Sequence, residues 1–111
     1  MAFSLTAGGN EQSLYTFQGG SDGAYPNGLT ALDGALYGTT QQGGGGSGCS
    51  AGCGIVFELT ASGGESVLYS FQGGTDGANP AAPLVAADSV LYGTTSNGGT
   101  SKDGTVFSIA P

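Results

Sequence analysis

A glycine-rich phrase is written twice in this chain of 111 residues, as TFQGGSDGAYP at 16–26 and SFQGGTDGANP at 70–80. The similarity continues on both sides of the phrase, and GTVFSIAP at the C-terminal end begins the unit a third time. Phe3, Phe57 and Phe107 mark one position of the unit, 54 and 50 residues apart. This period is that of one β-propeller blade and is longer than the coils of most solenoids. We therefore expect a fold built from a repeated structural unit.

The repeat covers nearly the whole chain, and a chain of this length is expected to form a single domain, residues 1–111. The units run over 2–55 and 56–105, and 106–111 start a third. Each unit is expected to hold four short strands, and Asp33-Gly34 is typical of a two-residue hairpin turn. Consecutive hairpins give a four-stranded antiparallel meander. Four tyrosines recur at strand positions and are expected in the core: Tyr15, Tyr37, Tyr69 and Tyr92.

Glycine is abundant, with 24 residues, but apolar residues make up 38% of the chain and fall in short runs such as IVFELT and SVLYSF. The glycines are therefore expected in turns between strands rather than in a disordered chain. No window shows the three- and four-residue apolar spacing of a helix. Apolar side chains on both faces of the strands indicate sheets that are covered on both sides. This pattern favours an all-β fold of β-propeller blades over a two-layer sandwich or a β-solenoid.

The formal net charge is −7, with one lysine, no arginine and no histidine. Such a chain offers no cationic surface for phosphates, so nucleic acid and anionic membranes are not expected as partners. No apolar run approaches the length of a membrane span. The beginning of the chain also lacks the basic flank and long apolar stretch of a signal peptide.

The same composition argues against an enzyme. The chain has no histidine for general base catalysis and no arginine to stabilise an oxyanion or a phosphate, and Lys102 is its only basic side chain. Carboxylates recur with the repeat at turns, as structural acids do, although glycoside hydrolysis would need only two of them. We expect no catalytic residues and no cofactor.

Two other motifs resemble metal-binding sequences. Asp22 and Asp76 lie in GGSDGA and GGTDGA, but calcium-binding glycine–aspartate repeats follow one another every nine residues. These aspartates are expected to cap their own turns. Cys49 and Cys53 would need two further ligands to hold zinc, and the chain has no histidine and no other cysteine. A local disulfide is expected there, and no metal.

Tyr25 stands apart from the other tyrosines because Asn79 takes its place in the second copy. Both lie in the phrase that we expect to connect one unit to the next. If such connections line one rim of the fold, their aromatic, amide and acidic side chains suit carbohydrate binding. The candidate ligand-binding residues are Asp22, Tyr25, Asn27, Asp76 and Asn79.

The motifs LYGTT, GTVF and LYSFQGGTDGANP occur here in a fixed order. In this combination, and over almost every residue, the chain resembles the GloVer-type tandem repeat of large secreted or surface-anchored bacterial proteins. The resemblance implies a many-copy repeat architecture and an extracellular or cell-surface location for the parent protein. It supplies no catalytic residues.

Counting strands predicts how such a chain assembles. One meander is complete, at 28–72, which leaves three strands at 83–110 and two at 2–18. These two sets flank the complete blade on opposite sides, so a seam blade must join the C-terminal set of one chain to the N-terminal set of the next. Head-to-tail contacts of this kind close into rings. We expect a cyclic homo-oligomer of three or four chains, with six or eight blades, as a structural, self-assembling module; the alternative is a glycan-binding, lectin-like module.

Overall fold

The computed structural model describes residues 2–5, 11–46, 48–60, 64–101 and 103–111, with side chains from Tyr15 onward. The prediction of an all-β fold is confirmed, since these residues form strands and no helix. Consequently, no helix able to cross a membrane is found among them. The strands are β1 (Ala2–Leu5), β2 (Glu11–Tyr15), β3 (Ala24–Leu32), β4 (Ala35–Gln42), β5 (Ile55–Leu59), β6 (Glu65–Ser70), β7 (Ala78–Pro80), β8 (Val85–Ala87), β9 (Val90–Asn97) and β10 (Thr105–Ile109).

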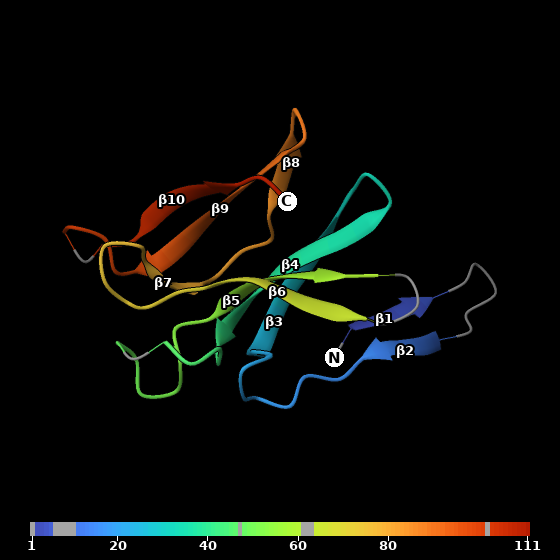
Figure 1. The fold of residues 1–111 in the computed structure, drawn as a ribbon, viewed down its shortest axis with the longest axis horizontal. Coiled ribbons are helices and arrows are strands. Elements are labelled where there is room, and N and C mark those ends of the chain that lie inside the picture. The colour runs from blue at the N-terminus through green and yellow to red at the C-terminus, as the bar shows by residue number, and fades with distance from the viewer. Residues whose placement is uncertain (1, 6–10, 47, 61–63, 102) are drawn as a thin grey trace.

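Two four-stranded antiparallel sheets and a hairpin make up the fold (Figure 1). The central sheet is a meander of consecutive strands, β3 to β6. In the C-terminal sheet, β10 pairs with one edge of β9, and β7 and β8 share its other edge. β1 and β2 form the N-terminal hairpin. Figure 1 shows the hairpin and the C-terminal sheet on opposite sides of the central sheet.

The glycine-rich phrase is a shorter connection than we expected. Its last residues already belong to strands, because β3 begins at Ala24 and β7 at Ala78. The expectation that Tyr25 and Asn79 lie in loops is therefore wrong. Pro26 is tolerated in β3 because this strand lies at the edge of its sheet, where a missing N–H costs no ladder hydrogen bond.

The two-residue turn expected at Asp33 and Gly34 is confirmed. Leu32 pairs with Ala35 across it, and the turn residues have φ values of 51° and 85°. Positive φ at both central residues is what a type I′ hairpin turn requires. In the second copy Asp88 and Ser89 take this place, with φ values of 52° and 63°. A serine in this region is strained where a glycine is not.

Both faces of the central sheet are covered, as its two-sided apolar pattern predicted. One core cluster lies between the central and C-terminal sheets, and a second lies between the central sheet and the N-terminal segment. The first contains Tyr37, Cys53, Val56, Phe71, Ala78, Leu84 and Leu91, and the second contains Ile55, Phe57 and Leu59 with Tyr15, Phe17 and Leu36 packed against them.

Candidate functional site

The N-terminal hairpin copies the outer half of the central sheet. Phe3 pairs with Ser13 in the hairpin, and their counterparts Phe57 and Val67 pair in the central sheet. The register shifts immediately before the phenylalanine in both cases. β1 and β2 therefore have the pairing that β5 and β6 have in the complete sheet.

The packing between neighbouring sheets also repeats. At each interface, a phenylalanine that follows an outer strand lies edge to face between a tyrosine of that strand and a phenylalanine of the next sheet, with ring centroids 5.0–5.2 Å apart. This geometry is favourable for aromatic pairs beyond the area that they bury. The two sets are Tyr15, Phe17 and Phe57, and Tyr69, Phe71 and Phe107.

The aspartate of each glycine-rich phrase caps its own turn. The Tyr15 hydroxyl donates to Asp22 Oδ2 at 2.7 Å, and the Gln18 N–H donates to the same oxygen at 2.9 Å. In the second copy the Tyr69 hydroxyl and the Gln72 N–H donate to Asp76 Oδ2, again at 2.7 and 2.9 Å. These are the hydrogen bonds expected of an aspartate that caps its own turn.

These contacts set the protonation states at the turns. Burial opposes ionisation of Asp22, but the hydrogen bonds from Tyr15 and Gln18 outweigh it and lower the pKa of the carboxyl. The same bond from Tyr15 to Asp22, together with burial, raises the pKa of the tyrosine to about 12. Each pair therefore consists of an ionised aspartate and a neutral tyrosine around neutral pH.

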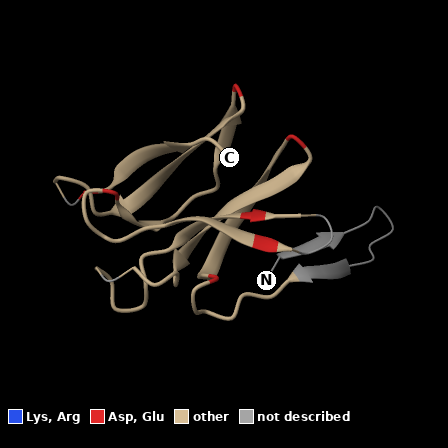
Figure 2. Cartoon of the chain, in the orientation of Figure 1, with Lys and Arg blue, Asp and Glu red and all other residues tan. Residues whose placement is uncertain are grey.

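The acidic side chains do not form a metal site within the described part of the chain. No group of three or more histidine, cysteine, aspartate or glutamate residues there could hold an ion. Figure 2 shows the acidic residues at separate places over the two sheets. Lys102 and the side chain of Glu11 lie outside what the structure describes.

The two asparagines proposed for ligand binding instead tie the two sheets together. Asn27 Nδ2 donates to the Pro80 carbonyl at 3.0 Å. Asn79 Nδ2 donates to the Gln41 carbonyl at 2.8 Å, and its backbone N–H donates to the Cys53 carbonyl at 2.7 Å. The bonds from Asn27 to Pro80 and from Asn79 to Gln41 join strands of different sheets, so the amides act at the contact between the central and C-terminal sheets.

Tyr25 is the one candidate ligand residue with a largely open side chain, which is 65% exposed. It occupies the position that Asn79 has in the second copy, and both have a φ of 58°. Asp22 and Asp76 lie in two separate turns, one in each copy. The structure thus brings Asn27 and Asn79 together at Gln41 and places Asp22 and Asp76 in separate turns.

Cys49 and Cys53 are joined by a disulfide, with 5.3 Å between their Cα atoms. Cys53 is fully buried in the core between the sheets. The loop that carries the bridge is held to the end of β6 by a hydrogen bond from the Gly48 N–H to the Gln72 carbonyl, at 3.0 Å. The bridge therefore fixes a loop that packs on the connection between the two sheets.

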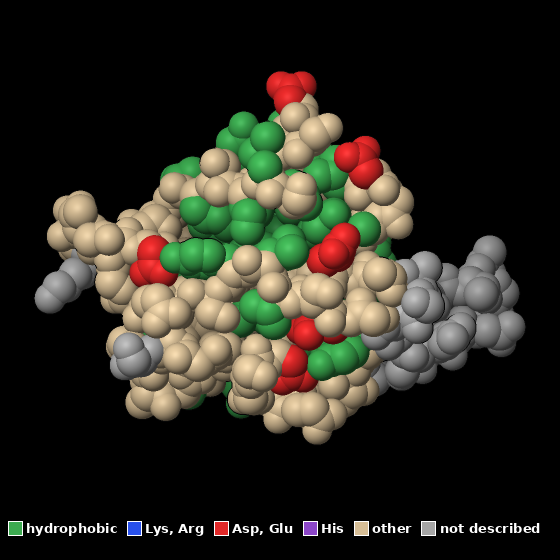
Figure 3. All heavy atoms as spheres, in the orientation of Figure 1, with side chains coloured by type: hydrophobic (Ala, Val, Ile, Leu, Met, Phe, Trp, Pro, Cys, Tyr) green, Lys and Arg blue, Asp and Glu red, His purple; other side chains and the backbone are tan. Residues whose placement is uncertain are grey.

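The outer face of the C-terminal sheet, which carries Val85, Tyr92 and Val106, is an apolar surface that no described residue covers. Val106 is 80% exposed, whereas its counterpart Val56 in the central sheet is fully buried. Tyr92 is 43% exposed and its counterpart Tyr37 only 5%. The expectation that Tyr69 and Tyr92 lie in the core is thus wrong for the single chain, since Tyr69 is also 40% exposed. Figure 3 shows hydrophobic side chains gathered in the middle and upper part of the view, over the C-terminal sheet and the adjoining part of the central sheet.

A second exposed residue lies on the opposite side of the chain. Leu29 is 37% exposed, whereas its counterpart Leu84 is 3% exposed. Leu29 pairs with Gly38, and Gly38 is covered by the Phe57 ring. Leu29 therefore lies on the face of the central sheet that is turned toward the N-terminal hairpin. Each end of the chain exposes positions that the other copy buries.

Sequence reasoning missed Leu29, Val85 and Val106 as functional candidates. Their aligned positions were visible, but nothing in the aligned residues distinguishes the buried member from the exposed one. Whether each of these side chains is buried or exposed depends on which neighbouring sheet is present, and the structure shows that directly.

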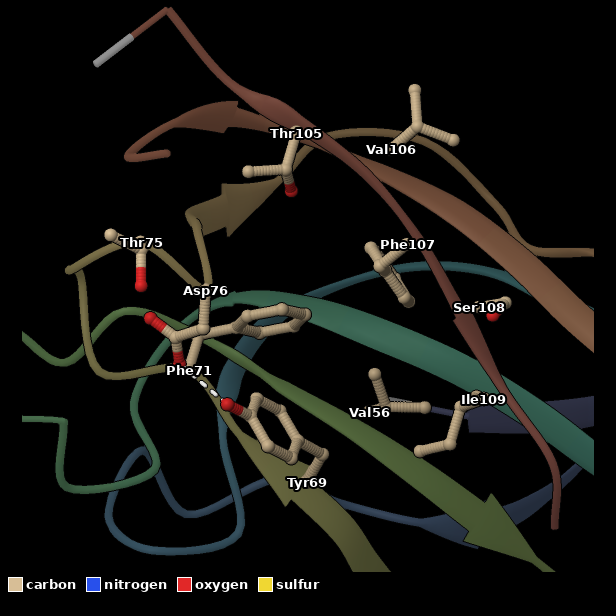
Figure 4. Close-up of a pocket in the computed structure, with 10 residues that line it drawn as sticks. All are labelled: Val56, Tyr69, Phe71, Thr75, Asp76, Thr105, Val106, Phe107, Ser108 and Ile109. Atoms are coloured by element: carbon tan, nitrogen blue, oxygen red, sulfur yellow. Dashed lines mark hydrogen bonds between the residues drawn. The ribbon is translucent and has the colours of Figure 1, made fainter. Parts of the chain in front are cut away.

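A pocket of about 330 Å³ lies beside β10 (Figure 4). Tyr69 and Phe71 of the central sheet form one wall, and Phe107 and Ile109 form the other. Figure 4 shows the Val106 side chain directed away from Tyr69 and Phe71. The pocket adjoins the edge of β10 that pairs with no described strand.

Comparison with known proteins gives a family and nothing more. No curated protein and no solved structure matches the chain. The model of one family, described as the Gloeobacter/Verrucomicrobia repeat, matches residues 1–111. This agrees with the GloVer-type resemblance and spans both copies, the hairpin and both sheets. The chain therefore belongs to the Gloeobacter/Verrucomicrobia repeat family.

Proposed function

We propose that this chain is a non-catalytic structural module of the β-propeller type that assembles head to tail with copies of itself. The outer face of the C-terminal sheet of one copy packs on the hairpin side of the central sheet of the next. Three or four chains close a ring, because two blade equivalents in each chain then give six or eight blades, within the usual range. The parent protein acts outside the cell or at its surface.

The observation that carries this proposal is the burial contrast between the two copies. Val56 and Tyr37 are buried because the C-terminal sheet packs on the central sheet, while Val106 and Tyr92 are exposed. Burying a valine or leucine side chain contributes about 1.5–3 kcal/mol. Repeating the existing sheet contact would cover the outer face, and it would cover Leu29 of the second copy at the same time.

The architecture supports a ring in two further respects. The central sheet has both faces covered, as a propeller blade does and a sheet of a two-layer sandwich does not. The interface packing recurs with the same edge-to-face aromatic contacts on both sides of that sheet. A contact that repeats with constant geometry between non-identical surfaces generates a closed ring when the rotation closes.

A carbohydrate-binding role is the second candidate, and it depends on the exposed ring of Tyr25. Asn79 is the counterpart of Tyr25, and its side chain donates a hydrogen bond to the preceding sheet. In a ring, the Tyr25 side chain would therefore lie against the preceding sheet and be covered. A glycan array separates the two roles. Saturable binding that Tyr25→Ala removes would favour the lectin-like module, and a flat array would remove it.

Assembly is tested by changing the outer face alone. Val106→Glu places a charge where the ring buries an apolar side chain, so light scattering should show the oligomer lost while the circular dichroism of the sheets is kept. Val106→Thr keeps the shape and branching of the side chain and serves as the matched control, which should still assemble. A wild-type chain that is monomeric at micromolar concentration, or an oligomer that tolerates Val106→Glu, would contradict the proposal.

A further inference from the structure

We propose that the free edge of β10 accepts the strand Glu11–Tyr15 of a second copy, so that the seam sheet combines β7 to β10 of one chain with one strand of the next. This inference rests on the head-to-tail assembly proposed above and specifies which strands form its seam. β10 and β1 of the second copy are both counterparts of β5. Only one of these two strands can therefore occupy the β5 position in the seam sheet.

The central sheet shows what belongs beside β10. There the counterpart of β10 is β5, and its outer edge is paired with β6. In the C-terminal sheet the same edge pairs with no strand that the structure describes, and the pocket between β10 and the central sheet lies along it. All five residues of β10 line this pocket, together with Tyr69, Phe71 and Asp76 of the preceding sheet and turn. An edge strand with unpaired backbone groups beside an apolar groove is a template for strand addition.

The strand Glu11–Tyr15 fits this place by its register. It is the counterpart of β6, and it pairs with β1 in the register that β6 has with β5, including the irregularity. Transferred to β10, this register places Gln12 opposite Ser108, because their counterparts Ser66 and Glu58 are opposite each other. The added strand supplies the ladder partners that the edge of β10 lacks.

β10 is the stronger competitor for the disputed place. Phe107 and Ile109 already pack against the core between the sheets, and Phe107 contacts Phe71 edge to face at 5.2 Å. At the position where the central sheet fully buries Val56, β10 has Val106 and β1 has Ala2. The β-branched valine buries more apolar area in a sheet than alanine does and suits a strand better. β10 therefore stays paired with β9, and β1 of the second copy gives up its pairing with β2.

Two cysteine pairs in the full-length chain distinguish this seam from its alternative. The proposed seam places Ser108 beside Gln12 of the second copy, so the variant Ser108→Cys with Gln12→Cys should form intermolecular disulfides under mild oxidation. The alternative exchanges the whole hairpin and pairs β9 with β1. By the register of Tyr37 with Glu58, it places Tyr92 beside Ser4, which the variant Tyr92→Cys with Ser4→Cys reports.

The readout is a non-reducing gel, in which seam disulfides give a ladder of dimers and larger species that reductant collapses. We expect a ladder from the variant with Ser108→Cys and Gln12→Cys. We expect no ladder from the variant with Tyr92→Cys and Ser4→Cys. A ladder from the second pair alone, from both pairs equally, or from neither pair in a chain that light scattering shows to be oligomeric, overturns the pairing of β10 with Glu11–Tyr15 but leaves the assembly standing. A monomeric wild-type chain overturns both.

Discussion

The same substitution at two counterpart positions should have very different effects on the stability of the single chain. Val56 is fully buried and Val106 is 80% exposed, although both occupy the same place in the repeat. Val56→Ala removes two buried carbon groups, each of which contributes about 0.8 kcal/mol. The cavity left between the sheets adds to this, so the free energy of unfolding should fall by about 2–3 kcal/mol. Val106→Ala should cost less than about 0.5 kcal/mol, as at most surface positions.

Urea unfolding followed by circular dichroism measures both values, at a protein concentration low enough for the chain to be dissociated. In a domain of this size, about 1 kcal/mol corresponds to a change of about 4–8 °C in Tm, so a thermal scan resolves the difference. At higher concentration Val106→Ala should also lower the midpoint, because assembly stabilises the folded chain by mass action. Equal losses for the two variants at low concentration would refute the account of why one position is buried and the other is not.

Three further substitutions test local features of the fold. Ser89→Gly should raise the free energy of unfolding by about 0.5 kcal/mol, because relief of the left-handed strain exceeds the added freedom of the unfolded chain. Gly34→Ser at the counterpart position should lower the free energy of unfolding. Urea midpoints that move the other way would contradict the turn assignment. Replacing both cysteines with serine should lower the free energy of unfolding by about 2 kcal/mol, measured against the oxidised chain, and an unchanged midpoint would show that the bridge adds nothing. Burial and the charge of Asp22 raise the pKa of Glu65, so its contribution to stability is present below the unfolded pKa and is lost as the pH rises through the folded pKa. Glu65→Gln should therefore stabilise the chain at pH 7 more than at pH 4, and an equal effect at both pH values would be inconsistent with this reasoning.

The local features of the fold could be read from the sequence. The turn at Asp33 and Gly34 was predictable because the conformation depends on the two turn residues themselves. The capping role of Asp22 was predictable for the same reason, since the aspartate bonds to a backbone N–H only four residues away. The meander followed from the order of the strands along the chain, although the loop between β4 and β5 is long.

The remaining features depend on contacts between distant parts of the chain. Tyr37 and Tyr92 lie in the identical motif LYGTT, yet one is buried and the other exposed. No local pattern can separate them, because the neighbouring sheet decides. Asn27 was read as a rim residue, and its bond to the Pro80 carbonyl joins two sheets that lie in different copies of the repeat. The early start of β3 was missed because Tyr25 adopts a positive φ, which is unusual inside a strand.

Sedimentation equilibrium of the unmodified chain over a range of micromolar concentrations tests the assembly most directly. The exposed outer face and the exposed Leu29 side predict one discrete species, with three or four times the mass of the 10.7 kDa chain. A species that stays at the mass of one folded chain across that range would contradict the head-to-tail ring.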